Sequence, residues 1–275
     1  MRKKIVVLDD YENSYKKLSN WAPIEKMADV EIFNRQLKGE ELLNAIKNAH
    51  VIVLMRDRTP LKADLIAQLP VLEYVVFTGT RNGTLDADAL KQRNILISHT
   101  EWGPSKESTT ELTWTLILGL QKRLIEQNAL LTQNGWRNQN SVLPILHGQT
   151  LGLIGLGEIG SRVAKVAIAF GMKVLTWSPN MTTERAAAVG AQSVTLDELL
   201  QQSHFVSLHI VASSTTKGLI NREKLALMRK DAILINTSRA MLVDTEALVS
   251  ALNHHQIAGA AVDVEQGGIA AGQAV

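Results

Sequence analysis

The sequence predicts an α/β protein with two parallel β-sheets, each covered by helices. Short apolar runs alternate with helix-like segments along most of the chain, and continuous apolar strands of this kind are typical of parallel sheets buried on both faces. The alternation is interrupted once by a long helical pattern and then restarts. Because 275 residues suffice for two separate cores, we expect two domains.

Residues 1–100 are predicted to form the first domain, an α/β domain of the flavodoxin-like type. Its strands are predicted at residues 5–8, 30–33, 51–54, 72–77 and 95–98. Helical patterns near residues 40–47, 62–68 and 86–92 separate the strands from the second one onward. This alternation predicts a parallel sheet that is covered on both faces.

A long helical pattern over residues 105–131 follows a Gly-Pro helix breaker. Its middle, residues 111–120, is apolar on more than one face, which is typical of a helix buried between two domains or between two subunits. A polar segment carrying Trp136 comes next. We therefore expect residues 105–148 to form a helical arm within a second domain, residues 101–275.

The second domain contains a glycine motif in the segment LGLIGLGEIG, residues 151–160. An apolar strand precedes the pattern Gly155-x-Gly157-x-x-Gly160, and a helical pattern follows it. The first glycine permits the tight turn, the second lets the backbone approach a pyrophosphate, and the third lets helix and strand pack closely. Free N–H groups and the dipole at the helix N-terminus favour an anion. This context predicts a dinucleotide site in a Rossmann-type, doubly wound sheet.

The rest of the chain fits a doubly wound sheet. Further strands are predicted at residues 173–176, 205–208, 232–235 and 260–264, with helices at 196–202, 222–228 and 244–253. Ligands of such sheets bind beyond the carboxyl ends of the strands. Polar residues follow the strands there, namely Ser178, His209, the turn 236–239 and Asp263. Taken alone, each of these residues could simply cap the end of a strand. Arg239 is the strongest candidate for binding, because its planar guanidinium can bind a carboxylate through two hydrogen bonds.

Composition excludes several partners and locations. The sequence is 45% apolar and 20% charged with a formal net charge of +2, so neither nucleic acid nor a membrane surface is implied as a partner. It has no cysteine, which excludes disulfides and thiolate metal sites. The first apolar run is too short for a signal peptide, and no run approaches the ~20 residues that span a bilayer. We expect a cytoplasmic protein without a bound metal.

Six segments in order resemble the D-isomer-specific 2-hydroxyacid dehydrogenases, which include phosphoglycerate dehydrogenases, D-lactate dehydrogenases and glyoxylate/hydroxypyruvate reductases. Besides the glycine motif they are TGTRNGTLD (78–86), ESTTELTWTLILGL (107–120), HIVASSTTKGLI (209–220), AILINTSRAMLVD (232–244) and IAGAAVDV (257–264). The resemblance implies hydride transfer between NAD or NADP and a small 2-keto or 2-hydroxy acid. It also implies a homodimer formed through the nucleotide domain; the alternative is that the apolar helix is buried only between the chain's own two domains.

The resemblance implies a role for each matching position. Backbone N–H groups of Thr78, Gly79 and Thr80, with Arg81 beside them, would hold the substrate carboxylate at the domain cleft. Arg239 would be the catalytic Arg, since the reaction needs a cation at the developing oxyanion. The implied cofactor contacts are Thr109 and Asp263 at the nicotinamide, Gly155, Gly157, Glu158, Ile159 and Gly160 around the pyrophosphate, His209 and Ser213 along the adenosine, and Thr237 and Ser238 through backbone groups.

The sequence departs from the family pattern where the proton donor is expected. The position of the family's catalytic Glu falls on Gly267 or Gly268, Glu265 lies too early, and the family's later His has no position; neither His254 nor His255 is a credible substitute. Loss of a general acid–base pair lowers rates roughly 10²–10⁴-fold. We therefore expect a C-terminally truncated member that lacks the return segment of the first domain and has impaired turnover. The alternatives are a cofactor-binding pseudoenzyme or regulatory scaffold, and a fragment that folds poorly.

The choice between NAD and NADP depends on the residue after the second strand of the nucleotide domain. Rossmann folds usually carry an acid there that binds the ribose hydroxyls. Here Ser178 stands at that position and Arg185 follows seven residues later. The sequence therefore permits NADP and does not exclude NAD.

Overall fold

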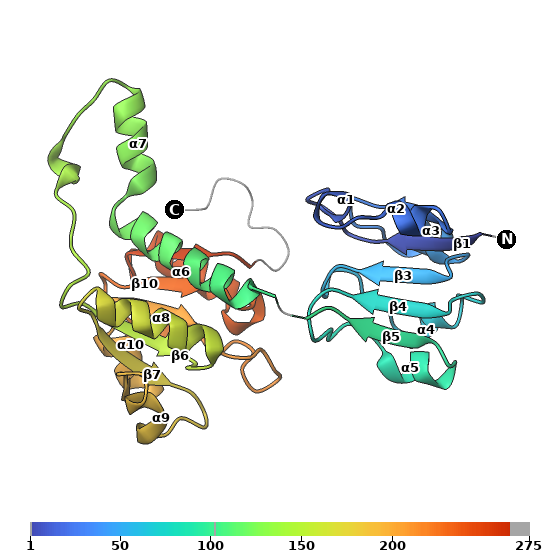
Figure 1. The fold of residues 1–275 in the computed structure, drawn as a ribbon. Helices are drawn as coiled ribbons and strands as arrows, with labels where there is room; N and C mark the ends of the chain where they lie inside the picture. The colour runs from blue at the N-terminus through green and yellow to red at the C-terminus, as the bar shows by residue number, and fades with distance from the viewer. Residues whose placement is uncertain (1, 102, 265–275) are drawn as a thin grey trace. The chain divides into compact units, whose positions relative to one another are not determined.

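The computed structural model describes residues 2–101 and 103–264 and divides the chain into two compact units, Met1–Gly103 and Pro104–Val275 (Figure 1). Each unit is an α/β body with its own parallel sheet and its own core, so the predicted fold class is confirmed. Among the described helices, none is both long enough and apolar enough to cross a membrane.

Unit 1 contains a five-stranded parallel sheet in the order β2-β1-β3-β4-β5, which is the flavodoxin-like order. The strands are β1 (Lys3–Val7), β2 (Ala28–Ile32), β3 (Val51–Leu54), β4 (Tyr74–Phe77) and β5 (Leu96–His99). The helices are α1 (Tyr15–Leu18), α2 (Ala22–Glu25), α3 (Gly39–Ile46), α4 (Ala63–Ile66) and α5 (Ala87–Gln92). Helices α1 and α2 were not predicted, because four residues are too few to show a helical period.

The two faces of the unit 1 sheet are covered to different extents. On one face Val6 and Ile52 pack in a buried cluster to which α3, α4 and α5 contribute. On the other face Val7 and Val53 pack against Trp21, and an apolar groove of about 450 Å³ remains over the strands. The expectation of full cover on both faces is therefore wrong for unit 1, because α1 and α2 are too short to span the sheet.

Unit 2 contains a six-stranded parallel sheet in the order β11-β10-β9-β6-β7-β8, the doubly wound order. The strands are β6 (Thr150–Ile154), β7 (Lys173–Trp177), β8 (Gln192–Ser193), β9 (Phe205–Leu208), β10 (Ile233–Asn236) and β11 (Gly259–Val262). The helices of the α/β alternation are α8 (Glu158–Ala169), α9 (Thr183–Ala187), α10 (Leu196–Gln202), α11 (Arg222–Leu227) and α12 (Thr245–Asn253). Short 3₁₀ turns occur at Gln139–Ser141 and Ala240–Leu242.

Helices cover both faces of the unit 2 sheet (Figure 1). Helix α6 (Ser105–Gln121) packs beside α8, where Trp114 and Ile117 join a buried cluster with Val163. Helices α10, α11 and α12 follow one another in a second cluster that includes Leu199 and Leu225. Because all strands are parallel, their carboxyl ends meet at a single edge of the sheet.

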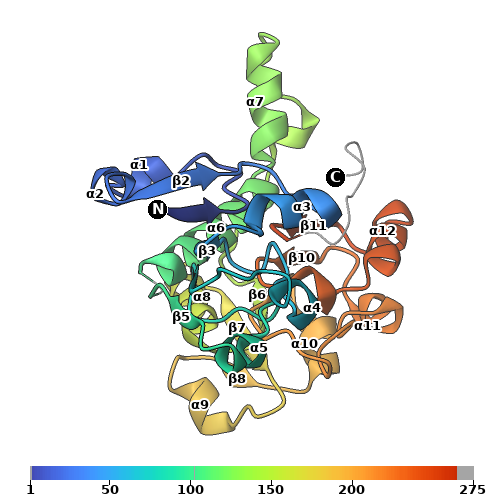
Figure 2. The same ribbon diagram turned by 90° about the vertical axis from the view of Figure 1, so that its right-hand side faces the viewer.

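The single long helix predicted over residues 105–131 is in fact two helices. Helix α6 ends at Gln121, and α7 (Leu124–Thr132) begins after Arg123, whose φ of 45° is left-handed. No Gly or Pro lies between residues 120 and 131, so the sequence contains no sign of this break. Helix α7 has no buried residue, and it projects from the body of unit 2 (Figures 1 and 2).

Candidate functional site

The glycine motif forms the turn between β6 and α8 at the carboxyl edge of the unit 2 sheet. Gly155 has a φ of 101°, and its N–H donates to the Trp177 carbonyl at 2.8 Å, which joins the turn to β7. A Cβ at Gly155 would lie 2.6 Å from the His209 carbonyl oxygen, and one at Gly160 would lie 2.3 Å from the Gly155 carbonyl oxygen. Both positions therefore admit only glycine.

The second glycine of the motif leaves room for a ligand. Apart from its chain neighbours, no heavy atom lies within 4 Å of the place where a Cβ of Gly157 would be. Gly157 is also the N-cap residue of α8 and has no side chain to cap it, so the N–H groups of Glu158, Ile159 and Gly160 have no side-chain acceptor from that residue. This open backbone at a helix start fits the pyrophosphate of a dinucleotide.

Ion pairs join the first turns of α6 and α8 beside this turn. Lys106 pairs with Glu158, and Arg162 lies 3.0 Å from Glu107. The Lys106 ammonium holds the pKa of Glu158 below its usual value. The negative charge of Glu158, one residue from Gly157, is thereby offset. Lys106 was not among the predicted site residues, because its partner lies 52 residues away in the sequence.

His209 directly follows β9, and its backbone and Cβ lie against the glycine turn. Its backbone N–H donates to the Ile154 carbonyl at 2.8 Å, and its Cβ would lie 3.5 Å from a Cβ at Gly160. Its Nε2 lies 2.9 Å from the Ser207 hydroxyl, and burial lowers its pKa to about 4. The ring is therefore neutral at pH 7, which suits a supporting residue and not a proton donor.

The turn after β10 is fixed by hydrogen bonds. The buried Asn236 donates from Nδ2 to the Arg239 carbonyl at 3.0 Å, and its Oδ1 accepts from the Ser238 N–H at 3.1 Å. The Thr237 hydroxyl lies 3.0 Å from that of Thr113 on α6, in a buried contact. The Arg239 side chain is exposed, and its Nη1 donates to the Ser238 carbonyl at 2.8 Å. A rigid turn thus presents the guanidinium of Arg239 at the carboxyl edge.

The other predicted cofactor residues of unit 2 come from neighbouring segments. Ser178 directly follows β7, and Asp263 directly follows β11, where its N–H donates to the Asn236 carbonyl at 3.0 Å. Thr109 lies in α6, and Ser213 lies in the loop after β9. The ends of β7 and β11 therefore carry Ser178 and Asp263 at the edge that also carries the glycine turn and Arg239.

The predicted substrate loop of unit 1 follows β4. The Thr78 hydroxyl accepts from the Arg56 N–H at 3.0 Å, and the Gly79 N–H donates to the Thr100 hydroxyl at 2.9 Å. A Cβ at Gly79 would lie 3.5 Å from Cδ and from Nη1 of Arg56, so that side chain lies against the loop. Arg56 was not among the predicted site residues, although its place just after β3, at the carboxyl edge of the sheet, is a signal in the sequence. Of the remaining loop residues, Thr80 is half-buried and Arg81 is exposed.

The residues considered for acid–base chemistry divide into two groups. His254 and His255 lie at the end of α12, where Nδ1 of His254 is 2.8 Å from a carbonyl oxygen of that helix. Neither directly follows a strand, unlike Ser178, His209 and Asp263. Glu265, Gly267 and Gly268 lie outside the described residues.

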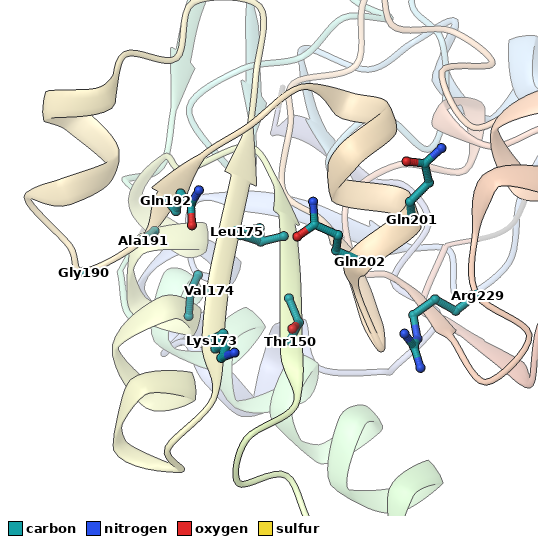
Figure 3. A pocket seen from close by; sticks show the side chains of 10 residues that line it. All are labelled: Thr150, Lys173, Val174, Leu175, Gly190, Ala191, Gln192, Gln201, Gln202 and Arg229. Carbon is teal, nitrogen blue, oxygen red and sulfur yellow. The ribbon is translucent and has the colours of Figure 1, made fainter.

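A pocket of about 630 Å³ in unit 2 lies at the opposite edge of the sheet (Figure 3). Thr150 and Lys173, the first residues of β6 and β7, line it together with Gln202 at the end of α10. Arg229, another lining residue, forms an ion pair with Asp231 at 2.7 Å. Because ligands of doubly wound sheets bind at the carboxyl edge, this pocket is not part of the candidate site.

Comparisons with known proteins agree with this arrangement. The family described as D-isomer specific 2-hydroxyacid dehydrogenase, NAD binding domain, matches residues 114–270. The glyoxylate reductase of Aeropyrum pernix is 35% identical over 251 residues, which are 88% of this chain and 74% of that protein. The D-3-phosphoglycerate dehydrogenase of Methanocaldococcus jannaschii is 34% identical over 262 residues, 95% of this chain and 48% of that protein.

Solved structures extend the likeness to the fold of the chain. A phosphoglycerate oxidoreductase from Vibrio cholerae has a TM-score of 0.87 and 31% identity, covering 98% of this chain and 86% of that one. The family match includes the glycine turn, the turn that carries Arg239, and Asp263. The chain therefore belongs to the D-isomer specific 2-hydroxyacid dehydrogenases, a family of NAD-dependent oxidoreductases.

Proposed function

We propose that this protein transfers a hydride between a nicotinamide cofactor and a small 2-keto or 2-hydroxy acid. The observation that carries the proposal is the common edge of the glycine turn and Arg239, which follow β6 and β10 on either side of β9. A dinucleotide site and a cation suited to a carboxylate thus lie at the same edge of one sheet, one strand apart. The names of the relatives, a glyoxylate reductase and a phosphoglycerate dehydrogenase, support this substrate class.

The residues of unit 2 would divide the work of binding and polarisation. When bound, the cofactor supplies or accepts the hydride at its nicotinamide ring. Gly155, Gly157 and the first N–H groups of α8 would hold its pyrophosphate, and the exposed Asp263 would accept a hydrogen bond from the carboxamide. Arg239 would bind the substrate carboxylate through its fork and place positive charge at the carbonyl oxygen as negative charge develops there.

In unit 1, we propose that the loop formed by residues 78–81 and the guanidinium of Arg56 contribute to binding the substrate acid. The N–H of Gly79 already donates to Thr100. The charged groups of Arg56 and Arg81 would therefore contribute more to anion binding than that N–H group does.

Loss of absorbance from reduced nicotinamide tests the proposal, with glyoxylate and hydroxypyruvate as substrates and NADH or NADPH as the reductant. We expect turnover, and we expect Arg239→Ala to lower kcat/KM about 10²–10³-fold because the developing charge loses its cation. Arg222→Ala is the matched control, since this Arg lies on α11. Absence of turnover at high protein concentration would contradict the proposal.

A second candidate function is cofactor binding without turnover. Glycines stand at positions 267 and 268, where the family resemblance implies the catalytic Glu, and His209 at the glycine turn is neutral and bonded to Ser207. Calorimetric titration with NADH and NADPH, combined with the turnover assay, separates the two functions. Binding without hydride transfer supports the second candidate, and turnover excludes it.

We propose that residues 124–145 of the helical arm form the contact of a homodimer. Its apolar side chains are exposed to an extent that is unusual for a lone protein surface. They are Leu124 (62% exposed), Ile125 (83%), Leu131 (53%), Trp136 (76%), Val142 (91%) and Ile145 (63%). Burying them against a second copy would recover roughly 25 cal/mol for each Å² removed from water.

A further inference from the structure

The loop after β7 contains a fixed turn beside the glycine motif. The N–H of Met181 donates to the Ser178 carbonyl at 3.1 Å, which closes a four-residue turn, and Pro179 at its second position restricts the backbone. The preceding residue, Trp177, accepts the hydrogen bond from Gly155. Ser178 thus directly follows the residue that is bonded to the glycine turn, at the place where Rossmann folds usually carry an acid for the ribose 2′-hydroxyl.

The guanidinium of Arg185 is tied to this turn. Its Nη1 donates to the Asn180 carbonyl at 2.8 Å, and its backbone N–H donates to the Thr182 hydroxyl at 3.2 Å. The next residue, Ala186, is fully buried in a core cluster of unit 2, and Met181 packs against the same cluster. The turn and the helix that carries Arg185 are therefore both anchored, so the cation is held at the Asn180 carbonyl, two residues after Ser178, before any ligand binds.

Negative charge is scarce in this segment. Between residues 177 and 188 the single carboxylate is that of Glu184. Hydrogen bonds from its own backbone N–H and from the Thr182 hydroxyl lower its pKa, so this carboxylate is engaged at the start of α9. An acid at position 178 would repel a phosphate, whereas the Ser178 hydroxyl can donate to one.

We propose that Ser178 and Arg185 bind the 2′-phosphate of NADP(H) and make it the preferred cofactor. The inference rests on the proposed function, because it requires a dinucleotide at the glycine turn. The Arg185 fork matches a phosphate, and such charge-assisted hydrogen bonds are about twice as strong as neutral ones. We therefore expect NADPH to bind about 10–100-fold more tightly than NADH.

Isothermal titration of the whole chain with NADPH, NADH, 2′,5′-ADP and ADP tests this assignment without any need for turnover. Arg185→Gln should weaken NADPH and 2′,5′-ADP about 10-fold or more and leave NADH and ADP nearly unchanged. Ser178→Asp should reverse the preference toward NADH. Arg222→Gln, which removes the same charge from α11, is the matched control and should leave all four affinities unchanged.

Each outcome bears on a different claim. Equal affinity for NADH and NADPH, or a preference for NADH, would overturn the inference and leave the proposed function standing. An Arg185→Gln variant that melts like the parent and loses affinity equally for all four ligands would also overturn it. Failure of the parent chain to bind either cofactor would overturn both the inference and the proposed function.

Discussion

The glycine turn and the helical arm, both in unit 2, are opposite kinds of structure. At the turn, residues 155 and 160 have no room even for a methyl group, because backbone atoms lie against them. In the arm, Ile125 and Trp136 are 83% and 76% exposed and have no cover from their own unit among the described residues. A single chain is therefore sufficient to shape the cofactor turn, whereas these apolar side chains of the arm would be covered only in the proposed dimer.

The largest expected effect concerns the turn. Gly155→Ala would place a Cβ 2.6 Å from a backbone oxygen on a backbone with a φ of 101°, so we expect the free energy of unfolding to fall by about 3 kcal/mol or more. Urea unfolding measures this loss. The matched control is Gly157→Ala, which meets no neighbouring atom and should cost less than about 1 kcal/mol while weakening dinucleotide binding. Equal destabilisation by the two variants would contradict the claim that close backbone contacts require glycine at position 155 and not at position 157.

Acid should weaken the same turn through His209. Its pKa is lowered from 6.5 to about 4, so above pH 6.5 neither the folded nor the unfolded state binds a proton at this ring. Between about pH 6.5 and 4 only the unfolded state does, and the free energy of unfolding falls by up to about 1.4 kcal/mol per pH unit. Below about pH 4 this contribution is constant.

Unfolding midpoints measured across this pH range test the effect of His209. The variant His209→Gln should show a shallower loss of stability toward acid than the parent chain. His204, whose pKa is also lowered mainly by burial, is present in both proteins and accounts for part of the remaining slope. An identical pH dependence in the two proteins would show that His209 does not titrate as described.

Substitutions in the arm should change the oligomeric state of the protein and leave the stability of the monomer nearly unchanged, which is the opposite of the effect expected at the glycine turn. Ile125→Ser should shift the chain from dimer to monomer in sedimentation experiments, yet change the unfolding free energy of the monomer by less than about 0.5 kcal/mol. Leu18→Ser is the matched control, since Leu18 is 81% exposed in unit 1. A parent chain that sediments as a monomer would remove the proposed role of the arm.

The smallest expected effect concerns the ion pair between Lys106 and Glu158. The Glu158 side chain is 63% exposed, so a double-mutant cycle with Lys106→Met and Glu158→Gln should give a small coupling that shrinks with added salt. A larger coupling would mean that the ion pair, and not backbone packing alone, holds the start of α8.

Local patterns in the sequence were enough to predict most strands and the edge of the sheet that carries the candidate site. Strands β3 and β9 have the predicted bounds, because a buried parallel strand must be apolar along its whole length. The glycine turn was equally accessible, since a positive φ and close backbone contacts demand glycine at particular spacings. Strand β8 was missed because Gln192 and Ser193 show no apolar run; it forms only by pairing with β7.

The tertiary structure alone decided how distant residues support that edge. Thr113 meets Thr237 across 124 residues, Lys106 meets Glu158 across 52, and the Arg56 side chain lies against Gly79. It also decided that Arg123 takes a left-handed conformation, so that α7 leaves the body of unit 2. The physical reason is the same in each case. Turn and strand signals depend on neighbours in the chain, whereas these contacts depend on which elements pack together after the sheet has formed.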